Sequence, residues 1–340
     1  MLTNEIRLNT EEFEIRNLSE FATKSRFSQG RRLEEAPCDI RTCFQRDRDR
    51  IIHSKAFRRL MHKTQAFTSP EGDHYRTRLT HTLEVSQISR TIAMALGLNE
   101  DLTEAIALGH DLGHTPFGHL GEDDLNRVVP GGFEHNKQSV RVVEVIEKNG
   151  IGLNLSMEVL DGILNHRGKG SPKTLEGKVV QISDKIAYIN HDIDDAIRAG
   201  ILTIDDLPED TVRLFGDHSA KRIDFLIKNI VKNSMGINDI IMTAEVKEKL
   251  YELRSFLFVN VYRSPMLSEE REMYGSYLSE LYEYYIENFD ELPDEFLQIC
   301  NVTGDSREKV VADYIAGMTD RFAQKQYEEI KKRKTEDFVE

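Results

Sequence analysis

The sequence has few of the features that mark exported or membrane-embedded proteins. Its 340 residues include only three cysteines, Cys38, Cys43 and Cys300, and no two of them form a CxxC pair. No run of about 18 consecutive apolar residues occurs, so no transmembrane helix is expected. The N-terminal stretch is acidic and lacks the apolar segment of a secretory signal. These absences favour a cytoplasmic protein with reduced thiols and no membrane partner.

An excess of positive charge is also missing, since the formal net charge is −14 at pH 7. This balance disfavours nucleic acid as a partner without excluding it. A phosphate-bearing ligand would need a metal ion or a local basic cluster. Residues 45–63 hold such a cluster, composed of Arg46, Arg48, Arg50, Lys55, Arg58, Arg59 and Lys63. Such charge runs usually form solvated, ion-paired helix faces, and the interspersed Asp47 and Asp49 fit that interpretation.

Strand-like alternation is scarce, and helical periodicity dominates. Residues 177–200 carry apolar side chains at steps of three and four, namely Val179, Ile182, Ile186, Ile189, Ile193 and Ile197. Asn99 is expected to cap a helix that begins at residue 100, and residues 80–96 repeat the helical spacing. Only "DHYRTRL", residues 73–79, suggests a short hairpin arm. The predicted fold class is therefore all-α.

Histidine is concentrated in "ALGHDLGHTPFGHLGEDDLN", residues 107–126. His110 and Asp111 stand where a predicted helix ends. Adjacent helical residues point about 100° apart, so both can reach one point only at the edge of the helix. A metal ion is the usual reason for such a pair, and imidazole nitrogen with carboxylate oxygen suits Zn, Mn or Fe(II).

Two further ligands are available on other predicted helices. His81 lies one helix earlier, and Asp184 lies on the 177–200 helix away from its isoleucine stripe. A helical bundle can build a metal site from side chains on facing helices in this way. The sequence therefore predicts a metal site formed by His81, His110, Asp111 and Asp184.

The order and surroundings of these residues resemble the HD superfamily of metal-dependent phosphohydrolases, and more narrowly the deoxyguanosinetriphosphate triphosphohydrolase-like family. The similar stretches are "RDRDRIIHSKAFRRLMHKTQAF", "RTRLTHTLEVSQISRTIA", "ALGHDLGHTPFGHLGEDDLN", "GGFEHNKQSVR", "ILNHRGK" and "VVQISDKIAYINHDIDDA". The resemblance implies an HD-domain helical bundle with a helical C-terminal extension. We expect an N-terminal segment at 1–45, the HD phosphohydrolase core at 46–200, and a helical part at 201–340 packed on the core.

The same resemblance assigns catalytic roles. His119 is expected to be a catalytic or phosphate-contacting residue, and Glu122 to orient it or raise its basicity. Glu134 and His135 match another active-site pair. His114 is expected to point at whatever the metal binds, or alternatively to make a structural hydrogen bond in the loop.

Substrate-binding residues are implied as well. Asp184, Tyr188 and Asp192 stand at i, i+4 and i+8 and so share one helix face. The resemblance places Tyr188 against a deoxyribose, Asp192 at its 3′-hydroxyl and Lys185 at the phosphates. Further matching positions, expected to contact sugar, base or phosphate, are Gln65, Arg78, Arg58 and Arg59.

The family relation implies hydrolysis of deoxynucleoside triphosphates to deoxynucleoside and tripolyphosphate. The expected cofactor is Mn, Fe, Ni, Co or Zn at the HD site, with Mg allowed on the substrate phosphates. Expected partners are the dNTP, a nucleotide effector and further copies of the chain, in a tetramer or hexamer. Two alternatives stay open at this point: another HD phosphohydrolase, such as a 5′-nucleotidase or phosphodiesterase, and a nucleotide-sensing HD protein without turnover.

Overall fold

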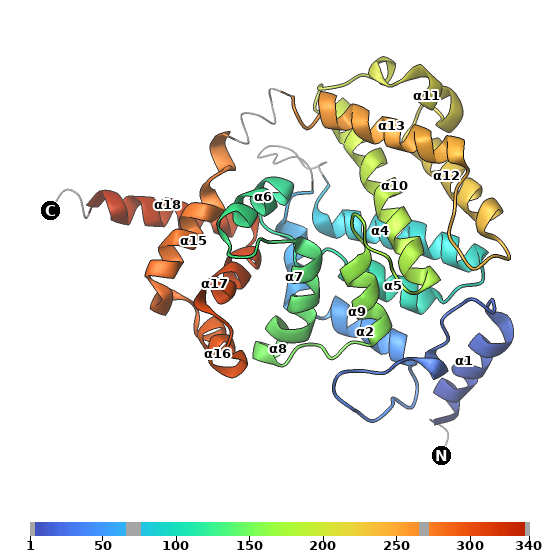
Figure 1. Ribbon diagram of the computed structural model, residues 1–340, viewed down its shortest axis with the longest axis horizontal. Coiled ribbons are helices and arrows are strands. Elements are labelled where there is room, and N and C mark those ends of the chain that lie inside the picture. Colours follow the sequence, from blue (N-terminus) through green and yellow to red (C-terminus); the bar gives the residue numbers. More distant parts are fainter. Residues whose placement is uncertain (1–3, 66–75, 265–271, 337–340) are drawn as a thin grey trace. The chain divides into compact units, whose positions relative to one another are not determined.

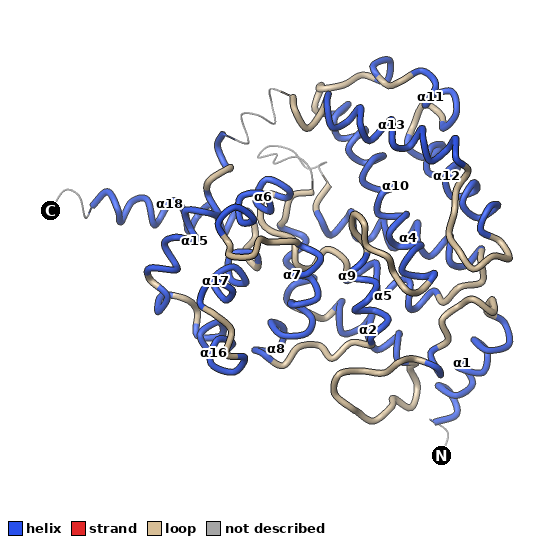
Figure 2. The backbone as a smooth tube through the Cα atoms, viewed as in Figure 1, coloured by secondary structure: helices blue, strands red, loops and turns tan. Residues whose placement is uncertain are grey.

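The computed structural model describes residues 4–65, 76–264 and 272–336. Within these ranges the chain is helical with no strand, as Figure 2 shows, and this confirms the predicted all-α class. Two isolated antiparallel bridges, Arg31 with Ser156 and Thr64 with Thr77, are the β-type pairings found there. None of the described helices carries a stretch apolar enough and long enough to cross a membrane.

The chain forms two compact units, each assembled from three separate stretches. The first unit comprises Met1–Ile52, His81–His110 and Leu155–Leu267, and the second comprises His53–Thr80, Asp111–Asn154 and Ser268–Glu340. The chain passes from the first unit to the second between His110 and Asp111. The division of the chain at residues 45 and 200 stays a prediction.

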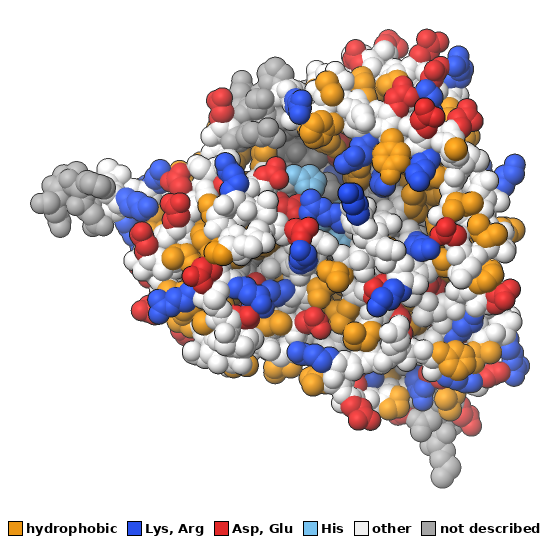
Figure 3. Space-filling model, viewed as in Figure 1, with side chains coloured by type: hydrophobic (Ala, Val, Ile, Leu, Met, Phe, Trp, Pro, Cys, Tyr) orange, Lys and Arg blue, Asp and Glu red, His pale blue; other side chains and the backbone are white. Residues whose placement is uncertain are grey.

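The first unit is built around the long helix α10 (Figure 1). Its helices are α1 (Asn4–Asn17), α2 (Cys43–Ile52), α4 (Arg78–Ala95) from His81 onward, α5 (Glu100–Gly109), α9 (Met157–Asn165), α10 (Leu175–Arg198), α11 (Glu209–Phe215), α12 (Ser219–Ser234) and α13 (Ala244–Asn260). Two short 3-10 turns, η1 (Ser25–Phe27) and η4 (Ile204–Asp206), belong to it as well. Helix α10 contacts α5, α9, α12 and α13. Figure 3 shows acidic side chains gathered over α11.

The apolar stripe predicted for α10 forms much of this core. Val179, Ile186, Ile189 and Ile193 are fully buried, whereas Ile197 is exposed at the end of the helix. Burying each such side chain contributes about 1.5–3 kcal/mol. The opposite face of α10 is thereby left to its polar residues.

The second unit is built around α15 and α17. Its helices are α3 (Lys55–Arg59), α6 (Gly118–Val128), α7 (His135–Arg141), α8 (Glu147–Gly150), α15 (Tyr277–Glu287), α16 (Asp294–Thr303), α17 (Arg307–Ala316) and α18 (Asp320–Glu336), with η2 (Leu60–His62), η3 (Val142–Ile146) and η5 (Phe289–Glu291). Helix α15 contacts α6, α17 and α18, and its core is rich in tyrosine and phenylalanine.

The hairpin arm suggested for residues 73–79 is not formed in its described part. Residues 73–75 lie outside the described ranges. Thr77 makes a single bridge with Thr64, and Arg78 already begins α4. The hydroxyl of Thr77 accepts a hydrogen bond from the backbone N–H of Thr80, so it serves the start of the helix rather than a strand.

Candidate metal and phosphohydrolase site

Three of the predicted metal ligands in the first unit come together from three helices. His81 lies on α4, His110 follows the last residue of α5, and Asp184 lies on α10. The distance from Nε2 of His81 to Oδ1 of Asp184 is 3.1 Å, and from Nε2 of His110 to the same oxygen it is 3.8 Å. One carboxylate oxygen therefore faces two imidazole nitrogens.

The charge state of Asp184 follows from these neighbours. Burial acts to raise its pKa, but the hydrogen bond from His81 and the charges of His110 and His81 outweigh burial and lower the pKa to about 2. An ionised carboxylate among buried imidazoles is a donor set that suits a divalent transition metal. The residues present in the first unit thus fit such an ion.

The sequence of α5 explains where His110 stands. The side chain of Asn99 accepts a hydrogen bond from the N–H of Leu102 and caps the helix, as predicted. The helix ends at Gly109, and Nδ1 of His110 lies 2.7 Å from the carbonyl oxygen of Ala107. This backbone contact fixes the ring with Nε2 directed at Asp184, in the manner common for metal-binding histidines.

A fourth residue, His166, lies in the same cluster and was given no role from the sequence. Ligand atoms of His110, His166 and Asp184 all lie within 4.8 Å of one another. The stretch "ILNHRGK" contains this residue, and its signal is a histidine that directly follows a helix, as His110 does. Sequence periodicity gave no reason to connect residue 166 with residue 110.

Asp111, the next residue in the chain, begins the second unit and is held by Arg78. Nη1 of Arg78 donates to Oδ2 of Asp111 at 2.7 Å, and Nη2 donates to the backbone oxygen of Gln65 at 3.3 Å. Arg78 is almost completely buried. In this structure it orients a predicted metal ligand, and Gln65 enters the arrangement through its backbone.

Glu122 joins two of the predicted catalytic histidines in the second unit. Its carboxylate lies 3.0 Å from Nδ1 of His135 and 3.4 Å from Nδ1 of His119. Burial acts to raise the pKa of Glu122, yet the hydrogen bonds with the two histidines hold it far below its usual range. The His119 side chain is 70% exposed, whereas His135 is buried. Glu122 is thus placed to orient both rings.

The other two predicted catalytic residues have different surroundings. His114 is buried and stacks on His135 with ring centroids 4.5 Å apart. Burial, followed by the positive charge of Arg78, lowers the pKa of His114 well below its ordinary value, so its ring is neutral at pH 7. Glu134 instead forms an ion pair with Lys137.

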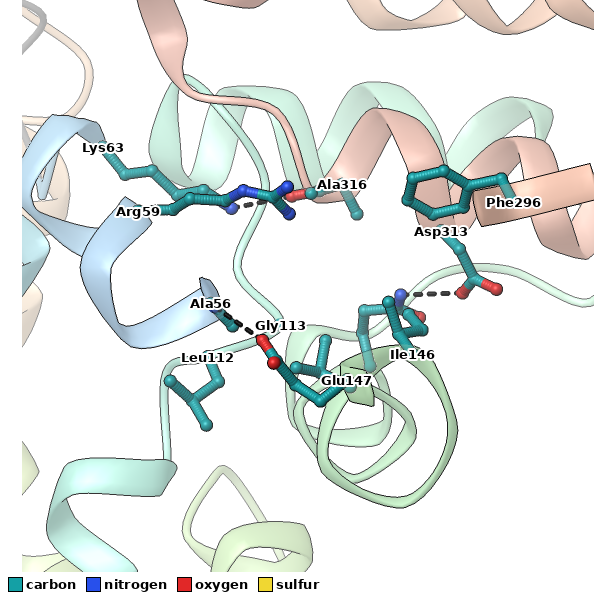
Figure 4. A pocket seen from close by; sticks show the side chains of 13 residues that line it. Ala56, Arg59, Lys63, Leu112, Gly113, Ile146, Glu147, Phe296, Asp313 and Ala316 are labelled. Atoms are coloured by element: carbon teal, nitrogen blue, oxygen red, sulfur yellow. Dashed lines mark hydrogen bonds between the residues drawn. The ribbon is translucent and has the colours of Figure 1, made fainter. Parts of the chain in front are cut away.

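The loop that carries His114 is fastened to the C-terminal helices of the second unit. Buried Lys63 donates to the carbonyl oxygens of His114 and Ala316, as Figure 4 shows for Ala316. Asp320, at the start of α18, accepts from the backbone N–H groups of Thr64 and Phe117. Phe117 has a left-handed backbone with φ of 59°, a conformation that a non-glycine residue adopts only when its surroundings hold it.

The face of α10 that carries the predicted substrate residues meets α13 and the turn after it. Nζ of Lys185 lies 5.1 Å from the ring centroid of Tyr251. Burial raises the pKa of Tyr188 to about 12, although the neighbouring Arg254 acts in the opposite direction. The hydroxyl of Tyr262 donates to Oδ2 of Asp192.

These partners on and after α13, Tyr251, Arg254 and Tyr262, were missed by the sequence analysis. Tyr251 and Arg254 lie three residues apart on α13, and Tyr262 lies in the turn that follows the helix. Nothing in that stretch alone distinguishes such residues from an ordinary helix surface.

The basic cluster of residues 45–63 divides into two parts. Arg46 and Arg50 pair with Glu35, and Arg48 pairs with Asp101 and Glu104, as expected for an ion-paired helix face. Arg58 donates to the carbonyl oxygen of His53. Arg59 lines the pocket of Figure 4 together with Lys63, Asp313 and Glu147.

The amino-acid sequence is similar to those of known proteins. Residues 78–189 match the HD domain, and residues 240–329 match the phosphohydrolase-associated domain. A "Deoxyguanosinetriphosphate triphosphohydrolase-like protein" of Caldanaerobacter subterraneus subsp. tengcongensis is 60% identical, covering 96% of this chain and 95% of that protein. A protein with the same description from Clostridium perfringens strain 13 is 52% identical, covering 96% and 97%.

Among solved structures, a hypothetical protein from Aquifex aeolicus is 22% identical with a TM-score of 0.47, covering 79% of this chain and 70% of that one. The identity to the curated relatives extends over almost the whole length of both chains. The chain therefore belongs to the deoxyguanosinetriphosphate triphosphohydrolase-like family of HD-type phosphohydrolases.

Proposed function

We propose that this protein hydrolyses deoxynucleoside triphosphates, dGTP or a broader set, to deoxynucleoside and tripolyphosphate. The observation that carries the proposal is the group in the first unit, where the carboxylate of Asp184 faces Nε2 of His81 and of His110. Relatives described as deoxyguanosinetriphosphate triphosphohydrolase-like support the choice of substrate.

A divalent transition metal would be held by His81, His110, Asp111 and Asp184. The first unit contributes the two imidazoles and one carboxylate, and Asp111 is joined to His110 by a single peptide bond. Such an ion, when bound, supplies Lewis acidity toward a phosphoryl oxygen and lowers the pKa of water. Mg²⁺ is expected only on the phosphates of the substrate.

The protein's own charged groups would bind the triphosphate. Lys185 directly follows Asp184 on α10, and its ammonium group stands over the Tyr251 ring at the surface of that face. Arg58 and Arg59 are further candidates for phosphate contact. Fixed positive groups stabilise the negative charge that grows on the phosphates during P–O cleavage.

Proton transfer is assigned to His119. Its ring is largely exposed, and Nδ1 faces Glu122, so Nε2 is left for a substrate. His119 would either protonate the leaving 5′-oxygen or act as a base or nucleophile. Glu122, which also orients His135, would stabilise the protonated form of the ring.

Sugar selection is assigned to α10. Tyr188 lies one turn beyond Asp184, about 6 Å along the helix axis, which is the scale of the distance from an α-phosphate to a deoxyribose. A ring beneath C2′ leaves little room for a ribose hydroxyl. Asp192, one further turn along and bonded to Tyr262, would accept a hydrogen bond from the 3′-hydroxyl.

The test is chromatography of products from each dNTP, each rNTP and dGMP with Mn²⁺ or Mg²⁺. Deoxynucleoside and tripolyphosphate in equal amounts support the proposal. Orthophosphate released from dGMP would favour a 5′-nucleotidase, and binding of dNTPs without any product would favour a nucleotide-sensing protein. The same samples, run on a sizing column with and without nucleotide, test the predicted tetramer or hexamer and the predicted effector.

A further inference from the structure

Helices α5 and α9 of the first unit end in the same way. His110 is the residue that caps the C-terminus of α5, and His166 caps that of α9. Nδ1 of each lies 2.7 Å from the carbonyl oxygen three residues earlier, that of Ala107 and of Ile163 respectively. A carbonyl oxygen only accepts, so Nδ1 of each ring is the donor in this contact, and Nε2 is the ring nitrogen on the opposite side.

Two reciprocal glycines bring these helix ends together. A side chain at Gly109 would collide with Ile163, and one at Gly162 would collide with Ile106. Each helix thus offers a glycine to an isoleucine of the other, which lets the two backbones approach closely. The ring centroids of His110 and His166 lie 5.0 Å apart at an interplanar angle of 77°.

Helix α10 brings the carboxylate to the same point. Nε2 of Gln181 donates to the carbonyl oxygens of Asn165 at 3.0 Å and of Gly170 at 2.8 Å, which fixes the end of α9 beside α10. Figure 1 shows α9 and α10 next to each other, and they are in contact. Asp184 follows Gln181 by nearly one turn, and its ligand atom falls within 4.8 Å of those of His110 and His166.

We propose that His166 is a further ligand of the metal, bound through Nε2, so that three imidazoles rather than two hold the ion. His166 and His110 share the same contact from Nδ1 to a backbone carbonyl, the same position after a helix and the same carboxylate neighbour. Two helix C-termini, each carrying partial negative charge, end beside the cluster and favour a cation there. This proposal rests on the proposed function only in assuming that a metal occupies the HD site.

The direct test counts imidazole groups around the metal. The whole protein is loaded with Co²⁺ alone, without nucleotide, and X-ray absorption at the cobalt edge measures the number of imidazole ligands. We expect three in the wild type and two in His166→Gln. Two imidazoles in the wild type would overturn the proposal, and this measurement does not depend on how well any variant folds.

Metal affinity gives a second measurement. Residues that only orient a metal ligand typically change metal affinity by about 10–100-fold when they are replaced. Loss of a direct ligand in His166→Gln should weaken Co²⁺ binding by more than that. The matched control is His191→Gln. His191 is equally buried with its ring centroid 5.8 Å from that of His81, but its Nε2 lies 3.3 Å from a carboxylate oxygen of Glu84.

The His191→Gln variant should keep three imidazole ligands on the metal. If His166→Gln binds Co²⁺ as tightly as the wild type, the proposal is contradicted. Because no nucleotide is present, that failure would leave dNTP hydrolysis untouched. Conversely, a protein with three imidazoles on the metal and no action on any dNTP would contradict only the proposed function.

Discussion

In the first unit, Nε2 of His81 and Nε2 of His110 face the carboxylate of Asp184. Nδ1 of His110 and Nδ1 of His166 each contact a backbone carbonyl oxygen. In the second unit, His119 and His135 instead present Nδ1 to Glu122, and His114 stacks on His135. We propose that the same residue types serve different chemistry in the two units. A ring held through Nδ1 by a backbone carbonyl turns Nε2 toward the proposed metal site, whereas a ring beside a carboxylate suits proton transfer.

The largest effect is expected from the carboxylate of the first unit. Asp184→Ala should remove bound transition metal and hydrolysis together, because it deletes the carboxylate oxygen that faces Nε2 of both His81 and His110. Helical circular dichroism should largely survive. Metal content by elemental analysis and product chromatography measure the two losses.

A suitable control is Asp239→Ala in the same unit, since Asp239 is an exposed residue that pairs with Lys178. It should leave metal and activity intact. Normal metal content in Asp184→Ala would remove that residue from the ligand set. Loss of metal in the Asp239 variant would show that the unit responds to any lost carboxylate.

A smaller but still large effect is expected in the second unit from His119→Ala. The variant should keep metal and substrate binding and lose about 10²–10⁴-fold in kcat, the range of a general acid–base group. Steady-state kinetics and metal analysis measure this. Loss of metal in the variant would contradict the contrast drawn between the two units.

Two glutamates of the second unit, Glu122 and Glu134, sharpen this comparison. Glu122→Gln should lower kcat because Glu122 faces both His119 and His135, whereas Glu134→Gln should have little effect because Glu134 pairs with Lys137. Equal losses of kcat in both variants would indicate that Glu134 acts in the site together with His135, as the sequence resemblance implies, and that its ion pair with Lys137 does not keep it out of the reaction.

Sugar choice is the next effect in size. Tyr188→Ala should relax the preference for dGTP over GTP while lowering overall efficiency, since the ring no longer fills the space beneath C2′. Asp192→Asn should weaken all deoxynucleotides about equally and affect 2′,3′-dideoxy-GTP far less. The measurement is kcat/KM for dGTP, GTP and 2′,3′-dideoxy-GTP.

Tyr262→Phe serves as the comparison for Asp192, because it removes the hydroxyl that donates to that carboxylate without changing the carboxylate itself. It should produce a weaker effect with the same pattern across substrates. A wild type that hydrolyses GTP as well as dGTP would end the argument for sugar selection.

Stability changes are expected where the loop of the second unit is fastened. Asp320→Ala leaves the N–H groups of Thr64 and Phe117 without their acceptor. The expected loss is about 1–3 kcal/mol in the free energy of unfolding, measured as a lower urea midpoint. Asp320→Asn keeps one acceptor oxygen and should lose less, and an unchanged midpoint in the Ala variant would show that water replaces the carboxylate.

A further effect on stability concerns pH. Burial, followed by the charge of Arg59, lowers the pKa of Lys63 to about 7 from 10.5. Between these values the unfolded chain binds more protons than the folded one, so stability should rise with pH from about 7 toward 10.5. Lys63→Met should reduce that slope between pH 7 and 9 in urea unfolding, and an identical slope would mean that Lys63 keeps an ordinary pKa.

Local sequence signals predicted much of the fold. The isoleucine stripe of α10, the Asn99 cap and the helix end before His110 all depend on residues within a few positions of one another, and the structure contains them. The suggested hairpin arm was wrong in its described part, because Thr77 and Arg78 start a helix. Alternation over so few residues is a weak signal for a strand, and here the helix start at Arg78 takes precedence.

Order along the chain by itself determined the family, the helical class and the residue types of the predicted site, from His81 to Asp192. Only the tertiary structure placed His166 beside His110, joined His135 to Glu122, and set Lys63 against Ala316 and Tyr262 against Asp192. Helical periodicity reports which residues share a face within a few turns. It carries no information on which distant faces meet, and that is decided by close approaches such as Gly109 against Ile163, where the absence of a side chain lets two helices touch.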